Sequence, residues 1–377
     1  MADGGASAVG DERRPSCLDG RDDWRWQLRH AVTTSAGLAR WLDLSPGERA
    51  GVDHAARGGL PLRVTPYVLS LLDRADPSCP LRRQFVPTAE EAVTVAGDLC
   101  DPLGERDHEV APRLVRRYPD RALLLLSDQC AAHCRFCTRR EWVARGRAKP
   151  SWQALAPALE YLRQEHSVRE VILSGGDPLL LGTNKLARLV AALRRIDHIQ
   201  TLRLATRVPS VLPQRVTREL CDRLRELHPI WVMTHFNHPA ELTVEASAAC
   251  RRLVDAGFPL MNQTVLLAGI NDRAEVLEAL FRRLISWRVR PYYLLQADPA
   301  RGTGHLRTPL AAGVALMASL QGRLSGIALP KLVVDTPGGL GKVPVGPETV
   351  VARSSGRTRL RTFRGVDVEY VDPPTVP

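Results

Sequence analysis

Hydrophobic positions along the chain follow two alternating periods from residue 122 onwards. Short apolar runs of strand length occupy residues 122–127, 170–173, 201–206, 230–234, 259–267 and 290–296. Between them, apolar residues recur at helical spacing over residues 152–164, 184–195, 213–227, 243–256 and 272–286. Short apolar strands that alternate with amphipathic helices indicate an α/β protein with a parallel sheet. Six βα units are predicted, and their functional edge is expected at the carboxyl ends of the strands.

The segments on either side of this alternation have other patterns. Apolar residues recur at helical spacing over residues 22–56, a short helix is predicted over residues 65–72, and residues 101–119 look irregular. After the core, a further helix is predicted over residues 310–324, and alternation over residues 350–370 about an Arg-Gly turn predicts a β-hairpin. The first twenty residues are poor in apolar side chains, which predicts disorder. We therefore divide the chain into a disordered N-terminus, a helical region, the βα core and a C-terminal extension, at residues 1–20, 21–115, 116–300 and 301–377.

Composition narrows the class of protein. A length of 377 residues allows one large domain with an accessory region, or two modest domains. The net charge of +11 comes from an arginine-rich composition spread over every predicted helix, so we expect no nucleic-acid partner. No apolar run is long enough to predict a membrane span, and the polar N-terminus does not resemble a signal peptide. The chain has 8 cysteines, three of them clustered, which favours a reducing, cytoplasmic setting over a disulfide framework.

The three clustered cysteines follow directly on the first predicted strand. Cys130, Cys134 and Cys137 have the spacing C-x₃-C-x₂-C within the stretch SDQCAAHCRFCTRR. Thiolates on so short a loop can converge on one soft metal centre, either zinc or an iron–sulfur cluster. A closed zinc site needs a fourth ligand, and no second Cys pair or His pair follows. The residues that could each supply one further metal ligand are His133, Cys100, Cys221 and Cys250. We favour a 4Fe–4S cluster with one open iron over zinc, and over three unrelated core cysteines.

This motif resembles the cysteine loop of the radical S-adenosyl-L-methionine (SAM) superfamily, in which SAM chelates the open iron. With its flanking residues the motif is similar to that of the lysine 2,3-aminomutase family, and the resemblance runs from about residue 22 to residue 370. It implies a partial (β/α)₆ radical SAM barrel with an N-terminal helical region and a C-terminal extension that binds pyridoxal 5′-phosphate (PLP). The implied cofactors are a 4Fe–4S cluster, SAM and PLP.

A glycine-rich turn, SGGDP, follows the second predicted strand. Two adjacent glycines let the backbone approach a ligand closely, although the same letters also make an ordinary turn. The resemblance assigns this turn to the methionine part of SAM, and it adds contacts from a THFNHP stretch and from the fifth predicted strand. By themselves, histidines in such a stretch are also compatible with a structural role or a metal site. The implied SAM contacts are Ser174, Gly175, Gly176, Asp177, His235 and Gln263.

A second glycine-rich turn, DTPGGLGK, ends at Lys342. It is not a P-loop, because the glycine spacing differs and Val343 replaces the required Ser or Thr. Such a turn suits a phosphate, and a lysine beside it offers the amine that PLP needs. The residues alone favour a surface lysine, but the resemblance reverses this, because the family carries its PLP lysine in a PGG-x-GK turn. The resemblance also implies PLP contacts from an RYPDR stretch at Arg117, Tyr118 and Arg121, which by itself reads as a solvated turn.

The resemblance also implies a substrate site. Arg139 matches the arginine that binds the substrate α-carboxylate, and Asp298 and Asp335 match two acidic positions that hold a cationic side chain. Each alone reads as a surface residue. Family members that act on glutamate carry basic or amide residues there, so two carboxylates imply lysine or arginine.

The implied activity is that of an isomerase, an aminomutase that converts L-lysine to β-lysine. The implied electron donor is a flavodoxin or ferredoxin. The alternatives are an arginine 2,3-aminomutase, a lysine mutase that serves elongation factor P, and, in a different class, an RNA-modifying radical SAM enzyme.

The chain departs from the family pattern at a zinc site that some relatives carry. Arg273 stands at the first zinc-ligand position, and no cysteine follows Cys250. Zinc is therefore not expected, and the oligomeric state, a homo-oligomer included, stays open. Leu294 and Leu295 also stand where the family often has a tyrosine near the substrate.

Overall fold

The computed structural model describes residues 22–144 and 150–373, and its centre is one ten-stranded sheet. Strands β3 to β9 are parallel, whereas β1, β2 and β10 run antiparallel to their neighbours, and β1 and β10 form the two open edges. The predicted disorder of residues 1–20 lies outside the described residues. The strands are β1 Glu109–Ala111, β2 Leu114–Tyr118, β3 Arg121–Ser127, β4 Glu170–Gly175, β5 Thr201–Ala205, β6 Ile230–Thr234, β7 Leu260–Leu266, β8 Val289–Gln296, β9 Lys331–Thr336 and β10 Gly341–Pro344.

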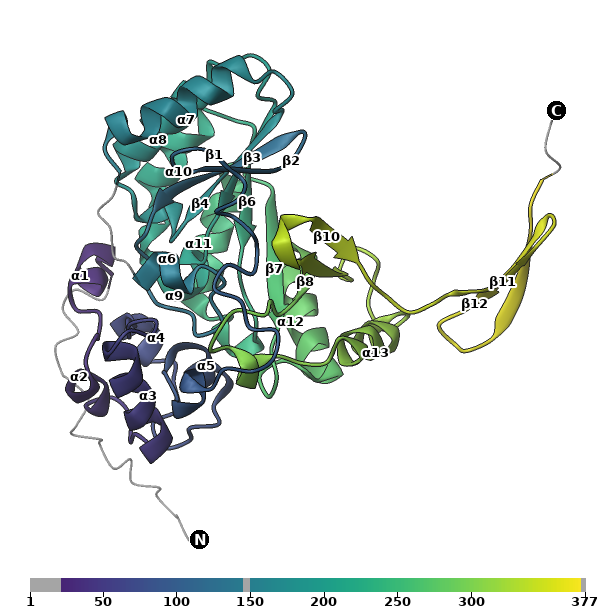
Figure 1. Ribbon diagram of the computed structural model, residues 1–377, viewed down its shortest axis with the longest axis horizontal. Coiled ribbons are helices and arrows are strands. Elements are labelled where there is room, and N and C mark those ends of the chain that lie inside the picture. Colours follow the sequence, from purple (N-terminus) through teal and green to yellow (C-terminus); the bar gives the residue numbers. More distant parts are fainter. Residues whose placement is uncertain (1–21, 145–149, 374–377) are drawn as a thin grey trace, which may run out of the picture.

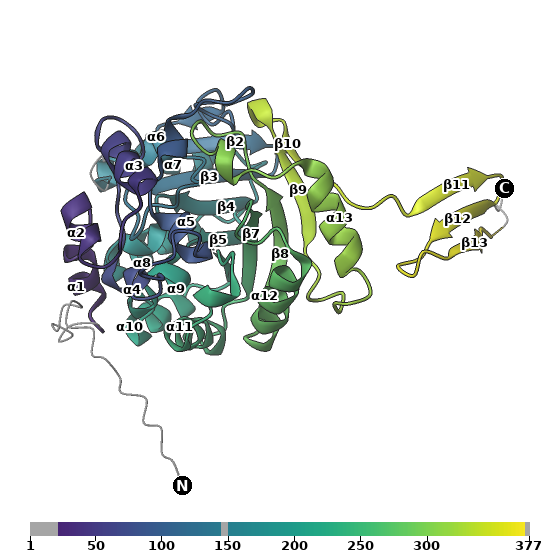
Figure 2. The same ribbon diagram turned by 90° about the horizontal axis from the view of Figure 1, so that it is seen from below.

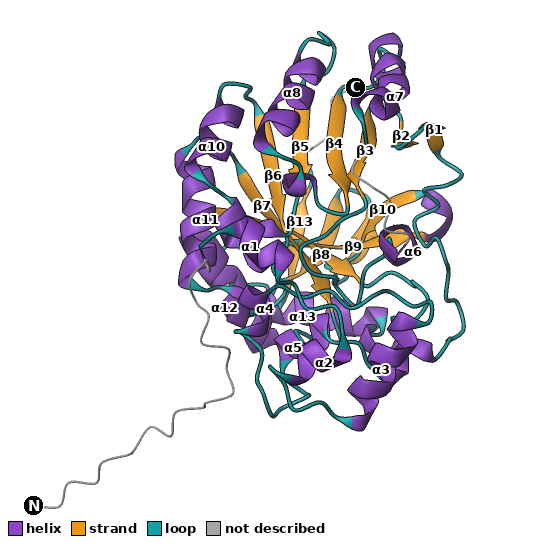
Figure 3. Ribbon diagram, turned by 90° about the vertical axis from the view of Figure 1, so that its left-hand side faces the viewer, coloured by secondary structure: helices purple, strands orange, loops and turns teal. Residues whose placement is uncertain are grey.

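Helices connect the parallel strands and line the outer face of the curved sheet (Figure 3). Their apolar residues recur at helical spacing, as in α8, where Leu186, Leu189, Val190 and Leu193 are buried. Serine or threonine side chains cap the N-termini of α7, α10 and α11 by accepting a backbone N–H. The crossover helices are α7 Trp152–Gln164, α8 Thr183–Arg194, α10 Arg218–Arg225, α11 Val244–Asp255, α12 Ala274–Ser286 and α13 Leu310–Leu320.

The six predicted strands are confirmed as β3 to β8, and the sheet contains more. Strand β9 was not predicted, because its short apolar run lies between Lys331 and Asp335. Strands β1 and β2 lie in residues 101–119, where the irregular prediction was wrong, because β2 (LVRRY) is apolar at one end only. The outcome is a mixed α/β protein with an open, partial barrel, as the sequence implied.

Short helices form the N-terminal region, as predicted, and they group beside the βα core (Figure 1). This region packs on the cysteine loop, where the His133 backbone N–H donates to the Arg63 carbonyl oxygen at 2.8 Å. The N-terminal helices are α1 Trp24–Arg29, α2 Ser35–Ala39, α3 Pro46–Ala56, α4 Pro66–Leu69 and α5 Pro80–Phe85, and two more short helices, α6 Arg140–Ala144 and α9 Val208–Val211, follow β3 and β5.

The C-terminal extension ends in a small antiparallel sheet that stands away from the core (Figures 1 and 2). The predicted hairpin is its β12–β13 pair, and a further strand, β11, pairs with β12. The strands are β11 Val350–Ser354, β12 Arg357–Arg361 and β13 Asp367–Val371. Within residues 22–144 and 150–373, no helix has the length and apolarity needed to cross a membrane.

Candidate functional site

Two adjoining cavities at the carboxyl ends of the parallel strands contain all the predicted site residues. The first, of about 260 Å³, is lined by Cys130, Cys134, Cys137, Arg139, Ser174, Gly175, Gly176, Asp177, His235, Gln263, Asp298, Asp335 and Lys342. The second, of about 400 Å³, is lined by Arg117, Tyr118 and Arg121, and it shares Arg139, Ser174, Gln263, Asp335 and Lys342 with the first. Parallel strands bring their carboxyl ends to one edge of a sheet, which is why residues far apart in sequence meet here.

Buried charge pairs fix the cysteine loop. Arg135 donates from Nε and Nη2 to both carboxylate oxygens of Glu91, at 2.7 and 2.6 Å, and Arg140 donates to the same carboxylate at 2.6 Å. On the other side of the loop, Arg207 donates from Nη1 to the Cys134 sulfur at 2.7 Å. These bonds hold the loop from the N-terminal region and from the end of β5.

The three thiols of the loop lie close enough to affect one another. Burial raises the pKa of Cys130 well above its usual value, and the neighbouring charges of Cys137 and Cys134 raise it further. Burial and Cys134 raise the pKa of Cys137 to about 11. Three ionised thiols therefore repel one another here unless a cationic centre lies between them.

The glycines of the SGGDP turn are required by close packing against the cysteine loop. A Cβ on Gly175, where φ is +119°, would lie 2.4 Å from the Ser127 carbonyl oxygen, and one on Gly176 would lie 2.3 Å from that of Gln129. The backbone N–H groups of Gly176 and Asp177 donate to these same two carbonyl oxygens. The turn thus joins β4 to the cysteine loop.

Asp177 joins the same turn to the end of β5. Its carboxylate accepts from the Thr206 hydroxyl at 2.8 Å and from the Arg207 backbone N–H at 2.8 Å. Burial raises the pKa of Asp177 to about 6 despite these bonds. The geometry therefore gives Asp177 a clear structural role at the edge of the cavity.

His235 lies at the end of β6 as a neutral imidazole. Burial and the Arg207 charge lower the pKa of His235 to about 3. Its Nε2 is 3.0 Å from the Asn237 side-chain oxygen, which also accepts the Val265 backbone N–H at 2.9 Å. That oxygen can only accept, so Nε2 carries the hydrogen and Nδ1 remains an acceptor.

Lys342 lies on β10 and lines both cavities. The amine pairs with Asp335, whose carboxylate also accepts from Arg117 at 3.3 and 3.4 Å. The Lys342 backbone N–H donates to the Tyr118 hydroxyl at 2.8 Å, and the Arg121 guanidinium stacks on the Tyr118 ring at 3.7 Å. Of the predicted PLP contacts, Tyr118 thus touches the Lys342 backbone, and Arg117 touches Asp335, the ion-pair partner of Lys342.

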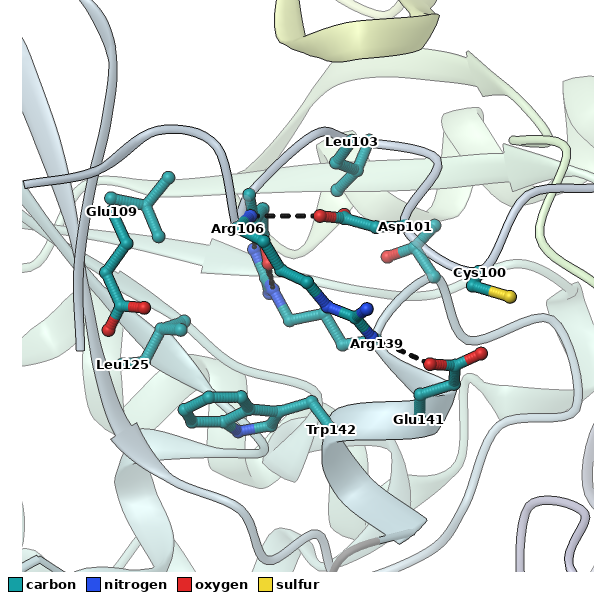
Figure 4. A pocket seen from close by; sticks show the side chains of 12 residues that line it. Cys100, Asp101, Leu103, Arg106, Glu109, Leu125, Arg139, Glu141 and Trp142 are labelled. Atoms are coloured by element: carbon teal, nitrogen blue, oxygen red, sulfur yellow. Dashed lines mark hydrogen bonds and ion pairs between the residues drawn. The ribbon is translucent and has the colours of Figure 1, made fainter. Parts of the chain in front are cut away.

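Arg139 follows the last cysteine of the loop and lies where three cavities meet. Its guanidinium donates to both oxygens of Glu105, and Nη1 is 3.3 Å from the Ser174 hydroxyl. Figure 4 shows Arg139 from the side of a smaller third cavity of about 60 Å³. Glu105 is therefore part of the site, although the sequence did not predict it.

Asp298 lies just after β8 and faces the cavity of about 260 Å³. Burial raises the pKa of Asp298 to about 7, and the nearby Asp335 charge adds to the rise, whereas Lys342, Arg117 and Arg139 oppose it. A cation that enters the cavity would favour the ionised form of Asp298.

Comparison with known proteins decides the family. The description "Radical SAM superfamily" matches residues 124–280, and "Lysine-2,3-aminomutase" matches residues 317–376. An L-lysine 2,3-aminomutase from Fusobacterium nucleatum is 45% identical over 352 residues, 93% of this chain and 83% of that protein. One from Clostridium subterminale is 44% identical over 352 residues, 93% of this chain and 84% of that protein. The chain belongs to the lysine 2,3-aminomutase family.

Membership of the lysine 2,3-aminomutase family makes the chain a radical SAM enzyme of the isomerase class, with a 4Fe–4S cluster, SAM and PLP as its cofactors. It leaves the substrate open. A glutamate 2,3-aminomutase from Clostridioides difficile is also similar, at 36% identity over 367 residues, 96% of this chain and 86% of that protein.

The residues of the cysteine loop in this chain fit a 4Fe–4S cluster. The three thiols share one cavity, and their mutual repulsion, described above, is what cationic iron would relieve. None of the four residues considered as a further metal ligand lines this cavity. They are His133, Cys100, Cys221 and Cys250. No group of three or more His, Cys, Asp or Glu side chains in residues 22–144 and 150–373 forms a ready-made metal-ion site.

PLP fits the lysine strand. The turn before Lys342 has positive φ at Gly338 and Gly339, and a Cβ on Gly339 would lie 2.6 Å from the His108 ring. Only glycine at position 339 therefore lets the turn pack this closely against His108. The adjoining cavity of about 400 Å³ carries Arg117 and Arg121, cations of the kind that bind a phosphate.

Several residues that were not predicted from the sequence also line the larger cavity. Arg203 on β5 pairs with Glu170 on β4 in the larger cavity, where Tyr292 donates to the Tyr293 hydroxyl at 2.8 Å. Arg203 had a signal, because it alternates with two buried leucines and so had to face the inside of the curved sheet. Glu105 had none, because it lies in an irregular loop.

Proposed function

We propose that this family member moves the α-amino group of free L-lysine to the β-carbon and forms β-lysine. The observation that carries the proposal is a single cavity lined by three cysteine thiols, the Lys342 amine and two carboxylates, Asp298 and Asp335. A site for lysine needs an anchor for its α-carboxylate and an anion for its side-chain ammonium. Arg139 and Asp298 line the same cavity and supply these charges.

In this proposal, each part of the cavity has one role. Cys130, Cys134 and Cys137 ligate the cluster, and Lys342 carries PLP with Arg117, Tyr118 and Arg121 near its phosphate. Contacts to SAM come from Ser174, Gly175, Gly176, Asp177, His235 and Gln263. When bound, the reduced cluster and SAM supply a radical that takes and returns a hydrogen atom at the substrate β-carbon, and PLP holds the migrating nitrogen.

The protein's own share is positioning and exclusion of water. Arg139 holds the substrate carboxylate, and Asp298 and Asp335 hold its cationic end, so the reacting carbon atoms are fixed between the cysteine loop and Lys342. The required single electron is expected from a flavodoxin or ferredoxin in the cytoplasm.

The specificity prediction concerns Asp298. Loss of one partner of a buried, hydrogen-bonded charge pair costs about 2–5 kcal/mol. Asp298→Asn should therefore lower kcat/KM for lysine by roughly 30- to 4,000-fold, measured in an anaerobic assay of β-lysine. SAM and PLP binding should stay near wild type, because Asp298 is not proposed to contact either. Asp335→Asn should also lower kcat/KM, but Asp335 pairs with Lys342, so its PLP content is expected to change too.

The matched control is Asp222→Asn, since Asp222 lies on the solvent side of α10 with 66% of its side chain accessible. It should behave as wild type. Unchanged lysine kinetics in the Asp298 variant would place the side-chain pocket elsewhere.

Arginine 2,3-aminomutase is the second candidate, because two carboxylates also suit a guanidinium. Purified enzyme should be assayed with free lysine, arginine and glutamate, and with unmodified elongation factor P. Rapid turnover of lysine alone supports the proposal. Preference for arginine or for the elongation factor would select those alternatives, and rapid turnover of glutamate would overturn the assignment of the acidic pair. Modification of RNA without any amino acid product would move the chain to another class.

A pH dependence follows from Asp298. Its pKa is raised to about 7, so its carboxyl group is largely neutral below that pH and ionised above it. Only the ionised form pairs strongly with a cationic side chain, so kcat/KM for lysine should rise with pH up to about 7 and then level off. The profile is measured on wild type and on Asp298→Asn. Loss of the rising limb in the variant supports the role, and the same limb in both proteins contradicts it.

A further inference from the structure

Glu105 makes the closest contact of the substrate-site arginine. Arg139 donates from Nε to Oε2 of Glu105 at 2.8 Å and from Nη2 to Oε1 at 2.6 Å. The pair is well shielded, with 20% of the Arg139 side chain and 13% of the Glu105 side chain accessible. A two-point, charge-assisted pair of this kind fixes the plane of a guanidinium as well as its position.

Glu105 lines two of the three cavities that Arg139 lines. Arg139 lines all three cavities, but Glu105 lines only the two of about 60 and 400 Å³. The cavity of about 260 Å³ that holds Lys342, Asp298 and the cysteines is not lined by Glu105. Glu105 occupies the Nε side of the guanidinium, and Nη1 points to Ser174 at 3.3 Å. Nη1 and Nη2 each carry a second N–H, and these two N–H groups are the ones that we assign to a substrate carboxylate.

The loop that carries Glu105 is anchored on both sides. On one side, the Leu103 carbonyl oxygen accepts from Arg117 at 3.0 Å, and Gly104 fits against Gly338, where a Cβ on Gly104 would lie 2.8 Å from the Gly338 carbonyl carbon. On the other side, Arg106 pairs with Glu141 at 2.7 Å (Figure 4). The loop thus connects the turn before Lys342 with the helix that follows Arg139, and it presents Glu105 at a fixed place.

We propose that Glu105 is a positioning residue that holds Arg139 in the orientation that binds the substrate carboxylate. This inference rests on the proposed function, since it needs an amino acid whose carboxylate meets Arg139. The opposite reading is that Glu105 competes with the substrate for Arg139. The geometry favours positioning, because Arg139 lines the cavity shared by Lys342, Asp298 and the three cysteines, whereas Glu105 does not.

The test compares Glu105→Ala, Glu105→Asp and wild type, each loaded with cluster and PLP. Outer partners of ligand-binding groups typically contribute 10- to 100-fold, so Glu105→Ala should raise KM for L-lysine by roughly that factor while kcat changes little. Glu105→Asp should recover part of the loss. A KM that is unchanged or lower in Glu105→Ala would show competition or no role, and would overturn the proposal.

A second measurement separates positioning from structural damage. Equilibrium dialysis compares L-lysine with L-lysinamide, which lacks the carboxylate. Wild type should bind lysine more tightly, and Glu105→Ala should lose that advantage with lysinamide binding unchanged. An equal loss for both ligands would indicate general damage and overturn the proposal.

The matched control is Glu160→Gln, because Glu160 is exposed on α7, pairs with Arg163 and lines none of the three cavities. It should retain the wild-type KM and the wild-type preference for lysine over lysinamide. A wild type that neither rearranges lysine nor prefers it to lysinamide would overturn the proposed function itself. A wild type that does both, with unaltered Glu105 variants, would overturn only the role of Glu105.

Discussion

Lys342→Ala is expected to abolish formation of β-amino acid while slow reductive cleavage of SAM continues. Removal of a group that acts covalently costs a large factor, and we expect a loss of at least about 1,000-fold in turnover. The two activities separate because Lys342 lies on β10 beside the glycine turn, whereas the cysteines lie on the loop after β3. Anaerobic assays of β-lysine and of 5′-deoxyadenosine measure the two outcomes on one sample.

The same assignment is checked by chemical labelling. Borohydride treatment of PLP-loaded wild type should fix a pyridoxyl group on the peptide that contains Gly341 and Lys342. Of the lysines that the structure describes, only Lys342 lines the two large cavities. Lys331→Ala is the matched control, because Lys331 is exposed at the other end of the neighbouring strand β9. Label on Lys331 or Lys185 would contradict the assignment.

The sequence predicted those parts of the site whose chemistry is local. Cys130, Cys134 and Cys137 share one loop, and Lys342 follows its own glycine turn, so spacing and resemblance were enough to select residues that line one cavity. The six core strands were also predictable, because β3 to β8 are dominated by short apolar runs. Strand β9 was not, since its central apolar residues are flanked by charged and polar ones.

Pairings between distant segments could not be predicted. Asp335 is predicted to face a substrate cation, and the structure adds contacts that the sequence did not predict, to Lys342 and to Arg117, which lies 218 positions away in the chain. Glu105 and Arg139 meet because a loop without periodicity crosses from the N-terminal region to the end of β3. Such contacts depend on where loops run in three dimensions, and no hydrophobic pattern records that path.

Cys134, one of the three proposed cluster ligands, accepts a hydrogen bond from a cationic side chain. Arg207 donates to the Cys134 sulfur, and its other contacts are Gln84 at 2.6 Å and Glu241 at 3.2 Å. Arg207 is buried, and the aromatic rings of Phe85 and Phe136 lie 4.7 and 5.1 Å from its guanidinium carbon. This hydrogen bond fixes the Cys134 sulfur at the wall of the cavity that all three cysteines line. Cys134 should therefore be essential to the cluster.

Cys134→Ala is expected to lose most of the cluster and, with it, all reductive cleavage of SAM. Anaerobically reconstituted wild type should hold about four irons per chain, and two remaining thiolates should not retain them. Iron content and visible absorbance measure the loss, and 5′-deoxyadenosine measures its consequence. Cys100→Ala is the matched control, because Cys100 lines the small cavity behind Arg139 and not the cavity of the three cysteines. It should keep its iron. One zinc and no iron in the purified wild type would overturn the radical mechanism, since a single zinc ion supplies no electron to SAM.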